Sequence, residues 1–186
     1  MAVHMRQTFS TAAVSIALAM LATLTTGAVP AQRVTREVVP GITNFARLET
    51  TIACGGATRP EAIAELKRMG FASVVSLRLA SEEGADIDRE AAAAKAAGLN
   101  FVHLPFNIAA PDAMLIERFV AAVTLPANQP AYVHCALGGR AAALWMIKRV
   151  QVDGWDEARA LEEATALGLN DRLRPFALDY IYAHQR

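Results

Sequence analysis

A cysteine and an arginine share one predicted strand-to-helix turn, in the segment "AYVHCALGGRAAALWMIKRV", residues 131–150. Cys135 follows an apolar strand, and Gly138 and Gly139 can adopt backbone angles that turn successive amide N–H groups to one side. The N-terminus of the next helix adds donors and its positive dipole end. Arg140 would close the ring with a guanidinium that grips two oxygens of an oxyanion. The segment therefore predicts a cradle for phosphate or sulfate, formed by Ala136, Leu137, Gly138, Gly139 and Arg140.

The same surroundings favour the thiolate form of Cys135, because a helix N-terminus and an arginine both stabilise negative charge on sulfur. A thiolate beneath a bound phosphate can displace the leaving group and form a cysteinyl-phosphate, which water then hydrolyses. We assign His134 a supporting role, a hydrogen bond that orders the loop. The alternative is a structural cysteine, because cysteine is often a core residue and glycine-containing turns are common.

The elements that must position this turn alternate along the chain. Apolar, β-branched stretches predict strands at 71–79, 100–106 and 131–134, and an earlier strand precedes Cys54. Helices are predicted at 58–70, 86–98, 111–123, 140–150, 156–168 and 171–184. This alternation predicts an α/β fold, with a central, mostly parallel sheet of four to five strands flanked by helices on both faces. Ligands bind at the carboxyl edge of such a sheet, where Cys135 would lie.

Several polar residues have expected places in this fold. Thr58 and Glu61 have the spacing of a capping box for the first helix, and Asp112 suits the first turn of the third. Residues 32–43 are predicted to be an irregular lead-in. Arg78 ends a strand at the carboxyl edge, where it could face the site, and an exposed salt bridge is the expected alternative. The acids of the neighbouring loop are expected to be solvated: Glu82, Glu83, Asp86 and Asp88.

Residues 1–31 have the order of a secretory signal peptide, with Arg6 near the start, an uncharged apolar run, and small residues before a predicted cut after Ala31. Cleavage after Ala28 and an uncleaved membrane anchor are the alternatives. The remainder, residues 32–186, has the length of one domain. We therefore expect a periplasmic or secreted protein with no membrane contact after cleavage.

The composition limits the kinds of partner that we expect the protein to bind. The chain has 18 basic and 18 acidic residues, so no net charge suggests a nucleic-acid partner. No group of histidines, cysteines and acids has metal-ligand spacing, and we predict neither a metal nor a cofactor. Cys54 and Cys135 are the only cysteines, and the sequence leaves open whether they are free or joined in a disulfide that would switch the nucleophile off. The oligomeric state is also open.

The motif "HCALGGR", residues 134–140, resembles the signature of the cysteine-dependent protein tyrosine phosphatase superfamily, in its compact dual-specificity-like bacterial branch. Residues 44–78 look like the first part of that branch: a strand, a Gly-Gly turn, a helix and a strand ending in Leu-Arg. Residues 98–119 look like its next strand, its acid-bearing loop and the helix behind, and the likeness spans residues 44–170. The resemblance implies a tyrosine-phosphatase-like fold and hydrolysis of phosphate monoesters, with the cysteine as nucleophile and the arginine holding the phosphate.

Three features depart from the family pattern. Four residues separate Cys135 from Arg140, whereas the family usually has five, and some bacterial relatives share the shorter spacing. Ala141 replaces the Ser or Thr that assists departure of the thiolate. Asn107 occupies the position of the general acid, and asparagine cannot deliver a proton. The nearest carboxylate, Asp112, is the predicted proton donor, with a water molecule as the alternative.

Two other functions fit part of the pattern. A rhodanese-like sulfurtransferase also holds a cysteine in a short cradle and needs no general acid, but it usually ends soon after the loop helix. A non-catalytic binding module would keep the anion cradle without turnover, which Asn107 and Ala141 would allow. For a phosphatase, the sequence does not choose among phosphotyrosine, phosphoserine, phosphoinositides and other small phosphate esters.

Overall fold

The computed structural model describes Met1 and residues 33–184, so the predicted signal peptide lies outside the described residues except for its first. The described part contains one six-stranded sheet: β1 (Val34–Arg36), β2 (Ala46–Leu48), β3 (Ile52–Gly55), β4 (Ser73–Ser76), β5 (Asn100–His103) and β6 (Ala131–His134). The predicted α/β class is confirmed, with more strands than the four to five expected. The segment 32–43 is not wholly irregular, because β1 pairs there with β2.

The four strands nearest the cysteine run parallel. The order across the sheet is β1-β2-β3-β6-β4-β5, and the antiparallel pairings are β1 with β2 and β2 with β3. β6 lies between β3 and β4, and all four of its residues are buried, as expected of an apolar strand covered on both faces. The chain therefore leaves the sheet at Cys135 from the middle of its carboxyl edge.

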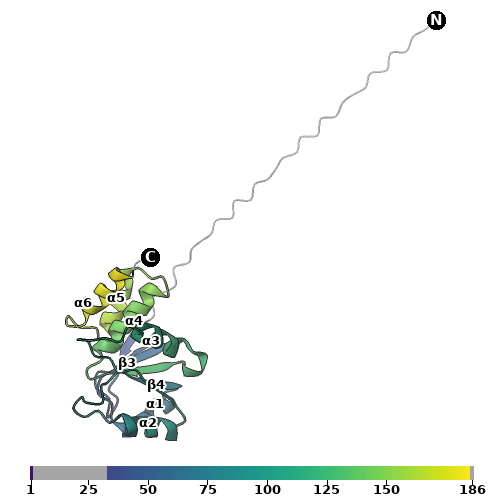
Figure 1. Ribbon diagram of the computed structural model, residues 1–186. Coiled ribbons are helices and arrows are strands. Elements are labelled where there is room, and N and C mark those ends of the chain that lie inside the picture. The colour runs from purple at the N-terminus through teal and green to yellow at the C-terminus, as the bar shows by residue number, and fades with distance from the viewer. Residues whose placement is uncertain (2–32, 185–186) are drawn as a thin grey trace. The chain divides into compact units, whose positions relative to one another are not determined.

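Helices cover both faces of the sheet, as the alternation predicts. The described residues form α1 (Ile63–Arg68), α2 (Ile87–Ala96), α3 (Leu115–Thr124), α4 (Gly139–Gln151), α5 (Glu157–Leu167) and α6 (Arg174–Ala183), with 3-10 turns η1 (Pro60–Ala62) and η2 (Pro126–Asn128). Figure 1 shows α4, α5 and α6 on one side of the sheet and α1 and α2 on the other. Apolar side chains of α3 to α6 form one core with the first face, and those of α1 and α2 form a second core with the other.

Helix α4, which begins within the predicted cradle, is fixed to α5 by a buried polar cluster. The carboxylate of Glu163 on α5 accepts hydrogen bonds from Trp145 Nε1 and Arg149 Nε, both at 2.7 Å. The Arg149 guanidinium also lies over the rings of Trp145 and Trp155, 4.6 and 4.1 Å from their centroids. The cluster therefore joins α5 to a helix that is itself buried along most of its length.

Two predicted helix starts are wrong in detail. Thr58 does not cap a helix, because its buried hydroxyl turns inward and lies 2.7 Å from the hydroxyl of Tyr132. Helix α3 begins at Leu115, later than predicted. Asp112 lies before it, where its Oδ1 accepts a hydrogen bond from the Met114 N–H at 2.8 Å. A short acidic side chain that bonds to nearby backbone competes in this way with an earlier helix turn.

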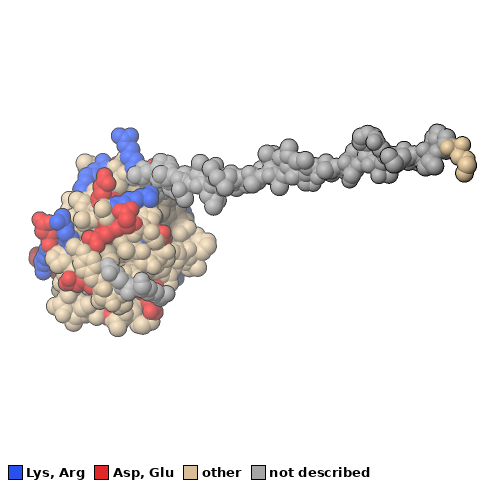
Figure 2. Space-filling view, turned by 90° about the horizontal axis from the view of Figure 1, so that it is seen from above, with Lys and Arg blue, Asp and Glu red and all other residues tan. Residues whose placement is uncertain are grey.

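The surface carries charges of both signs. Figure 2 shows basic and acidic side chains interspersed over the visible part of the domain, in keeping with their equal numbers. That face has no broad surface of positive charge, the kind that attracts nucleic acid. Within residues 33–184, no helix is long and apolar enough to cross a bilayer.

We predict that Glu163→Gln lowers the free energy of unfolding by about 1–3 kcal/mol, because it removes the negative charge that two buried donors share. Urea unfolding followed by tryptophan fluorescence measures the change. Glu162→Gln is the matched control, since Glu162 is the exposed neighbour and should contribute less than about 0.5 kcal/mol. Equal effects of the two substitutions would contradict the role assigned to the cluster.

Candidate active site

The cysteine lies at the bottom of a turn whose backbone requires glycine. Cys135 is 2% exposed, and its N–H donates to the Gly55 carbonyl of the neighbouring strand at 3.2 Å. Gly138 has a φ of +98°, a left-handed conformation that other residues rarely adopt, and it caps the N-terminus of α4. Its N–H donates to Cys135 Sγ at 3.1 Å. A main-chain donor and the N-terminus of α4 therefore both lie next to the sulfur.

The carbonyls of the turn are bonded to other segments. The Ala136 carbonyl accepts from the Ala57 N–H at 2.8 Å, and the Leu137 carbonyl accepts from Asn44 Nδ2 at 3.2 Å. Since these oxygens are engaged by the chain on either side of β3, they do not compete with an anion for the space above Cys135. The turn keeps the arrangement that an oxyanion cradle needs.

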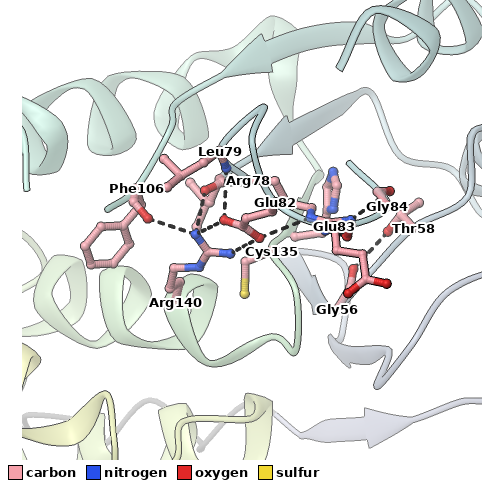
Figure 3. A network of polar contacts seen from close by, with 12 residues as sticks. Gly56, Thr58, Arg78, Leu79, Glu82, Glu83, Gly84, Phe106, Cys135 and Arg140 are labelled. Atoms are coloured by element: carbon pink, nitrogen blue, oxygen red, sulfur yellow. Dashed lines mark hydrogen bonds and ion pairs between the residues drawn. The ribbon is translucent and has the colours of Figure 1, made fainter. Parts of the chain in front are cut away.

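The Arg140 guanidinium is held in place by three segments of the chain (Figure 3). Its Nη1 and Nη2 donate to the two carboxylate oxygens of Glu82 at 2.6 and 2.8 Å. Nη1 also donates to the carbonyls of Leu77 and Phe106, at 3.1 and 2.8 Å. These four hydrogen bonds leave the Nε edge of the guanidinium for a ligand. Arg140 thus lies beside Cys135, as predicted, with its orientation fixed before any ligand arrives (Figure 3).

Glu82 is not solvated, contrary to the sequence-based expectation. Partial burial alone would raise its pKa, but the hydrogen bonds from Arg140 and from the Leu79 N–H lower the pKa to about 2. Partial burial would likewise lower the pKa of Arg140, but Glu82 and Cys135 raise it. Each group of the pair stabilises the charged form of the other. The remaining loop acids lie as expected, because Glu83, Asp86 and Asp88 are exposed.

Arg78 reinforces the same carboxylate. Its Nε donates to Glu82 Oε2 at 3.2 Å, and its other nitrogens donate to the carbonyls of Glu83 and Gly84. The predicted salt bridge is present, but Arg78 is only 3% exposed and is not at a solvated edge. The spacing of Arg78 and Glu82 in the sequence hints at their contact, whereas nothing in it indicates that Arg140 meets the same acid.

A cavity of about 280 Å³ opens above the cysteine. Besides Cys135, Glu82 and Arg140, it is lined by Ala136, Leu137 and Gly139 of the turn, by the apolar residues Leu79, Phe106, Ile108 and Leu173, and by Asn107, Asn170 and Arg172. The walls are therefore largely apolar and the floor is polar. Such a cavity suits a phosphate carried by an apolar body.

Asn107 and Asp112, the two residues considered for the position of the general acid, differ in whether they line the cavity. Asn107 lines the cavity, and its Oδ1 accepts from the Ala109 N–H at 3.0 Å. Asp112 is not among the lining residues, and its Oδ2 pairs with Arg118 Nη1 at 2.9 Å. The assignment of Asp112 as proton donor stays a prediction. Among the described lining residues, Glu82 is the one carboxylate.

His134 points to the opposite face of the sheet. It is fully buried, its ring stacks on Tyr132, and its Nε2 lies 3.2 Å from Oε2 of the buried Glu90 on α2. The ring nitrogens of His134 have no hydrogen-bond partner within residues 33–184, so the loop-ordering hydrogen bond predicted for His134 is not found there, and the nearest charged group is Glu90 across the second core. Glu90 was not predicted, although it shares a helix face with Ala94, four residues on, which is also buried.

Cys54 and Cys135 are both free thiols. Burial, together with the nearby Cys135 and Glu163, raises the pKa of Cys54 far above its ordinary value. Cys54 is accordingly a neutral core thiol on β3, and it is not among the residues that line the cavity.

Comparison with known proteins agrees with this geometry. Among solved structures, the chain is similar to TpbA from P. aeruginosa, at 25% identity and a TM-score of 0.63 over 84% of this chain and 92% of that one. It is also similar to a putative phosphatase from Shewanella putrefaciens, at 20% identity and a TM-score of 0.62 over 78% and 96% of the two chains. The core catalytic domain of the PP-IP phosphatase Siw14 from S. cerevisiae gives 21% identity and a TM-score of 0.58 over 75% and 87%.

These structural neighbours have the tyrosine-phosphatase-like fold, so the fold implied by the resemblance is confirmed. Among curated proteins, none matches the chain. One family model, described as "Beta-lactamase hydrolase-like protein, phosphatase-like domain", matches residues 44–152, more than half of the chain and the whole of the cysteine turn. The chain belongs to this phosphatase-like family.

Proposed function

We propose that the protein is an exported, cysteine-dependent phosphatase that hydrolyses phosphate monoesters through a cysteinyl-phosphate intermediate. The family and the neighbouring phosphatases support phosphatase activity in general. The observation that carries the finer proposal is the sulfur of Cys135, which receives the Gly138 N–H at 3.1 Å next to the anchored Arg140. Export rests on the signal-peptide pattern of residues 1–31.

In the first step, the Cys135 thiolate attacks phosphorus, the sulfur–phosphorus bond forms, and the bond to the leaving oxygen breaks. Arg140 and the amides of the turn hold the three remaining phosphate oxygens as charge develops on them. In the second step, water attacks the same phosphorus, inorganic phosphate leaves, and the thiolate is restored. No cofactor enters either step.

The leaving oxygen takes its proton from water in this proposal. The ion pair with Arg140 keeps Glu82 ionised, and Asp112 is paired with Arg118 outside the cavity lining. A missing general acid slows alkyl esters more than aryl esters, because phenolates leave more easily. The apolar walls of the cavity also suit aryl esters. We therefore favour an aryl phosphate such as phosphotyrosine, and TpbA, a structural neighbour, has been crystallised with pTyr.

The test is hydrolysis of p-nitrophenyl phosphate, followed beside a thiosulfate-to-cyanide transfer assay on the same sample. We expect wild-type hydrolysis without sulfur transfer, and complete loss of hydrolysis in Cys135→Ser. Cys54→Ser is the matched control and should keep its activity, because Cys54 lies outside the cavity lining. Sulfur transfer without hydrolysis would favour the rhodanese-like alternative. Phosphate binding without hydrolysis would favour the non-catalytic one.

Glu82→Gln should lower kcat/KM for p-nitrophenyl phosphate by about tenfold to a hundredfold, because Arg140 loses the carboxylate that orients it. Because the pKa of Glu82 is lowered to about 2, Glu82 is ionised and orients Arg140 at any pH above its ordinary pKa of 4.5. This orienting effect is lost only as the pH falls toward 2. The ratio of wild-type to variant kcat/KM should therefore stay constant between about pH 5 and pH 8.

Glu83→Gln is the control for this prediction, because Glu83 is the exposed neighbour in the same loop. A pH-dependent ratio, or an equal loss in both variants, would contradict the positioning role of Glu82.

Asn107→Asp should restore a proton donor, because Asn107 lines the cavity at the position where the family carries an acid. We expect hydrolysis of an alkyl phosphate to rise by at least about tenfold, with little change for p-nitrophenyl phosphate, whose leaving group needs no proton. Rates over a series of leaving groups measure the difference. A uniform change across the series would mean that position 107 does not reach the leaving oxygen.

A further inference from the structure

The loop between α5 and α6 forms one wall of the active-site cavity and is fixed to the cradle. Asn170, Arg172 and Leu173 of this loop line the cavity. The side chain of Asn170 lies against the turn so closely that a Cβ on Gly139 would be 2.9 Å from its Nδ2. The loop therefore has a defined position relative to Cys135.

Internal hydrogen bonds also order this loop. The Leu173 N–H donates to the Asn170 carbonyl and to its side-chain Oδ1, at 3.0 and 3.2 Å. The Arg174 N–H donates to the same carbonyl at 2.9 Å. Leu169 and Leu173, on either side of this loop segment, are buried. The backbone at Arg172 is thus fixed by the hydrogen bonds of a short segment, and its side chain is the part that a ligand would orient.

The charge of Arg172 has no counterpart in the cavity. Three charged residues line it, and two of them, Glu82 and Arg140, pair with each other. Arg172 is exposed and has no hydrogen bond or ion pair within residues 33–184. The acid beside it, Asp171, is instead 3.4 Å from Arg174. Arg172 therefore presents an uncompensated positive charge to the cavity.

Apolar side chains line the same cavity as this charge and the phosphate cradle. Leu137 is 64% exposed at the mouth of the turn, and Ile108 lines the same cavity. A ligand that fills the cavity would meet the donors of the cradle, the apolar side chains and the charge of Arg172. An aryl phosphate alone satisfies the first two features and leaves the third unused.

We propose that Arg172 binds a second anionic group of the substrate, a carboxylate or a second phosphate on the molecule whose phosphate is cleaved at Cys135. This inference rests on the proposed function and narrows its substrate class to phosphate esters with an apolar body and a further negative charge, such as phosphotyrosine beside acidic residues. Arg172 determines specificity and takes no part in the chemical step.

The experiment compares wild type with Arg172→Gln on four substrates: p-nitrophenyl phosphate, and phosphotyrosine peptides with neutral flanks, with acidic flanks, or with a second phosphate. Arg172→Gln should raise KM for the substrates with a second anion by about two- to fivefold, the range of an exposed ion pair, with kcat unchanged. KM for the other two should not change. The second anion, carboxylate or phosphate, whose substrate shows the larger rise in KM is the group that Arg172 prefers.

Arg174→Gln is the matched control, since Arg174 is a partly exposed arginine in the same segment that does not line the cavity. The wild-type preference for the acidic peptide should also weaken as salt rises from about 0.05 to 0.5 M, because an exposed ion pair is screened. A structural effect of the substitution would not follow salt in this way.

Several results would overturn the inference: no change in KM for Arg172→Gln, an equal change on all four substrates, or an equal change in Arg174→Gln. Absence of hydrolysis by the wild type would instead overturn the proposed function. In that case, binding of the same peptides to the Cys135→Ser variant still tests Arg172. Tighter binding of the acidic peptide that depends on Arg172 supports the site, and equal binding of neutral and acidic peptides rejects it.

Discussion

The Arg140 guanidinium joins parts of the chain that are far apart in the sequence. It lies in the first turn of α4, and it donates to the carbonyls of Leu77 and Phe106 and to the carboxylate of Glu82. The two carbonyls follow the adjacent strands β4 and β5, so one side chain fixes the cradle against the carboxyl edge of the sheet. Donors that are oriented before the substrate arrives need no reorganisation during the reaction, and the chemistry depends on this alignment.

The balance of charge around that guanidinium also matters. Arg78 and Arg140 share the single carboxylate of Glu82, so the three groups together carry one positive charge at the edge of the cavity. A second carboxylate would cancel the attraction for an anion, and no carboxylate would leave two partly buried cations close together. The observed set holds the arginine firmly and still favours a negatively charged ligand.

The cradle was predictable because its parts are contiguous: Cys135, the glycines and Arg140 belong to one strand-to-helix turn, whose chemistry follows from local backbone geometry. The parallel sheet was predictable from the alternation of apolar strands with helices. Glu82, Glu90 and Arg172 were not, because each comes from a segment that has the composition of a solvated surface. Only the packing of α2 against the sheet and of two loops against the cavity brings these side chains to the site.

Two of the four acceptors of Arg140 are main-chain oxygens, which no exchange of a side chain can delete. The walls of the cavity, by contrast, are made by side chains such as Leu79, Ile108 and Leu137, which none of these anchoring bonds uses. Recognition and reactivity are thereby encoded separately. A combinatorial library confined to the wall positions would sample new ligand shapes over an unaltered reaction centre, which makes the fold a suitable scaffold for redesign.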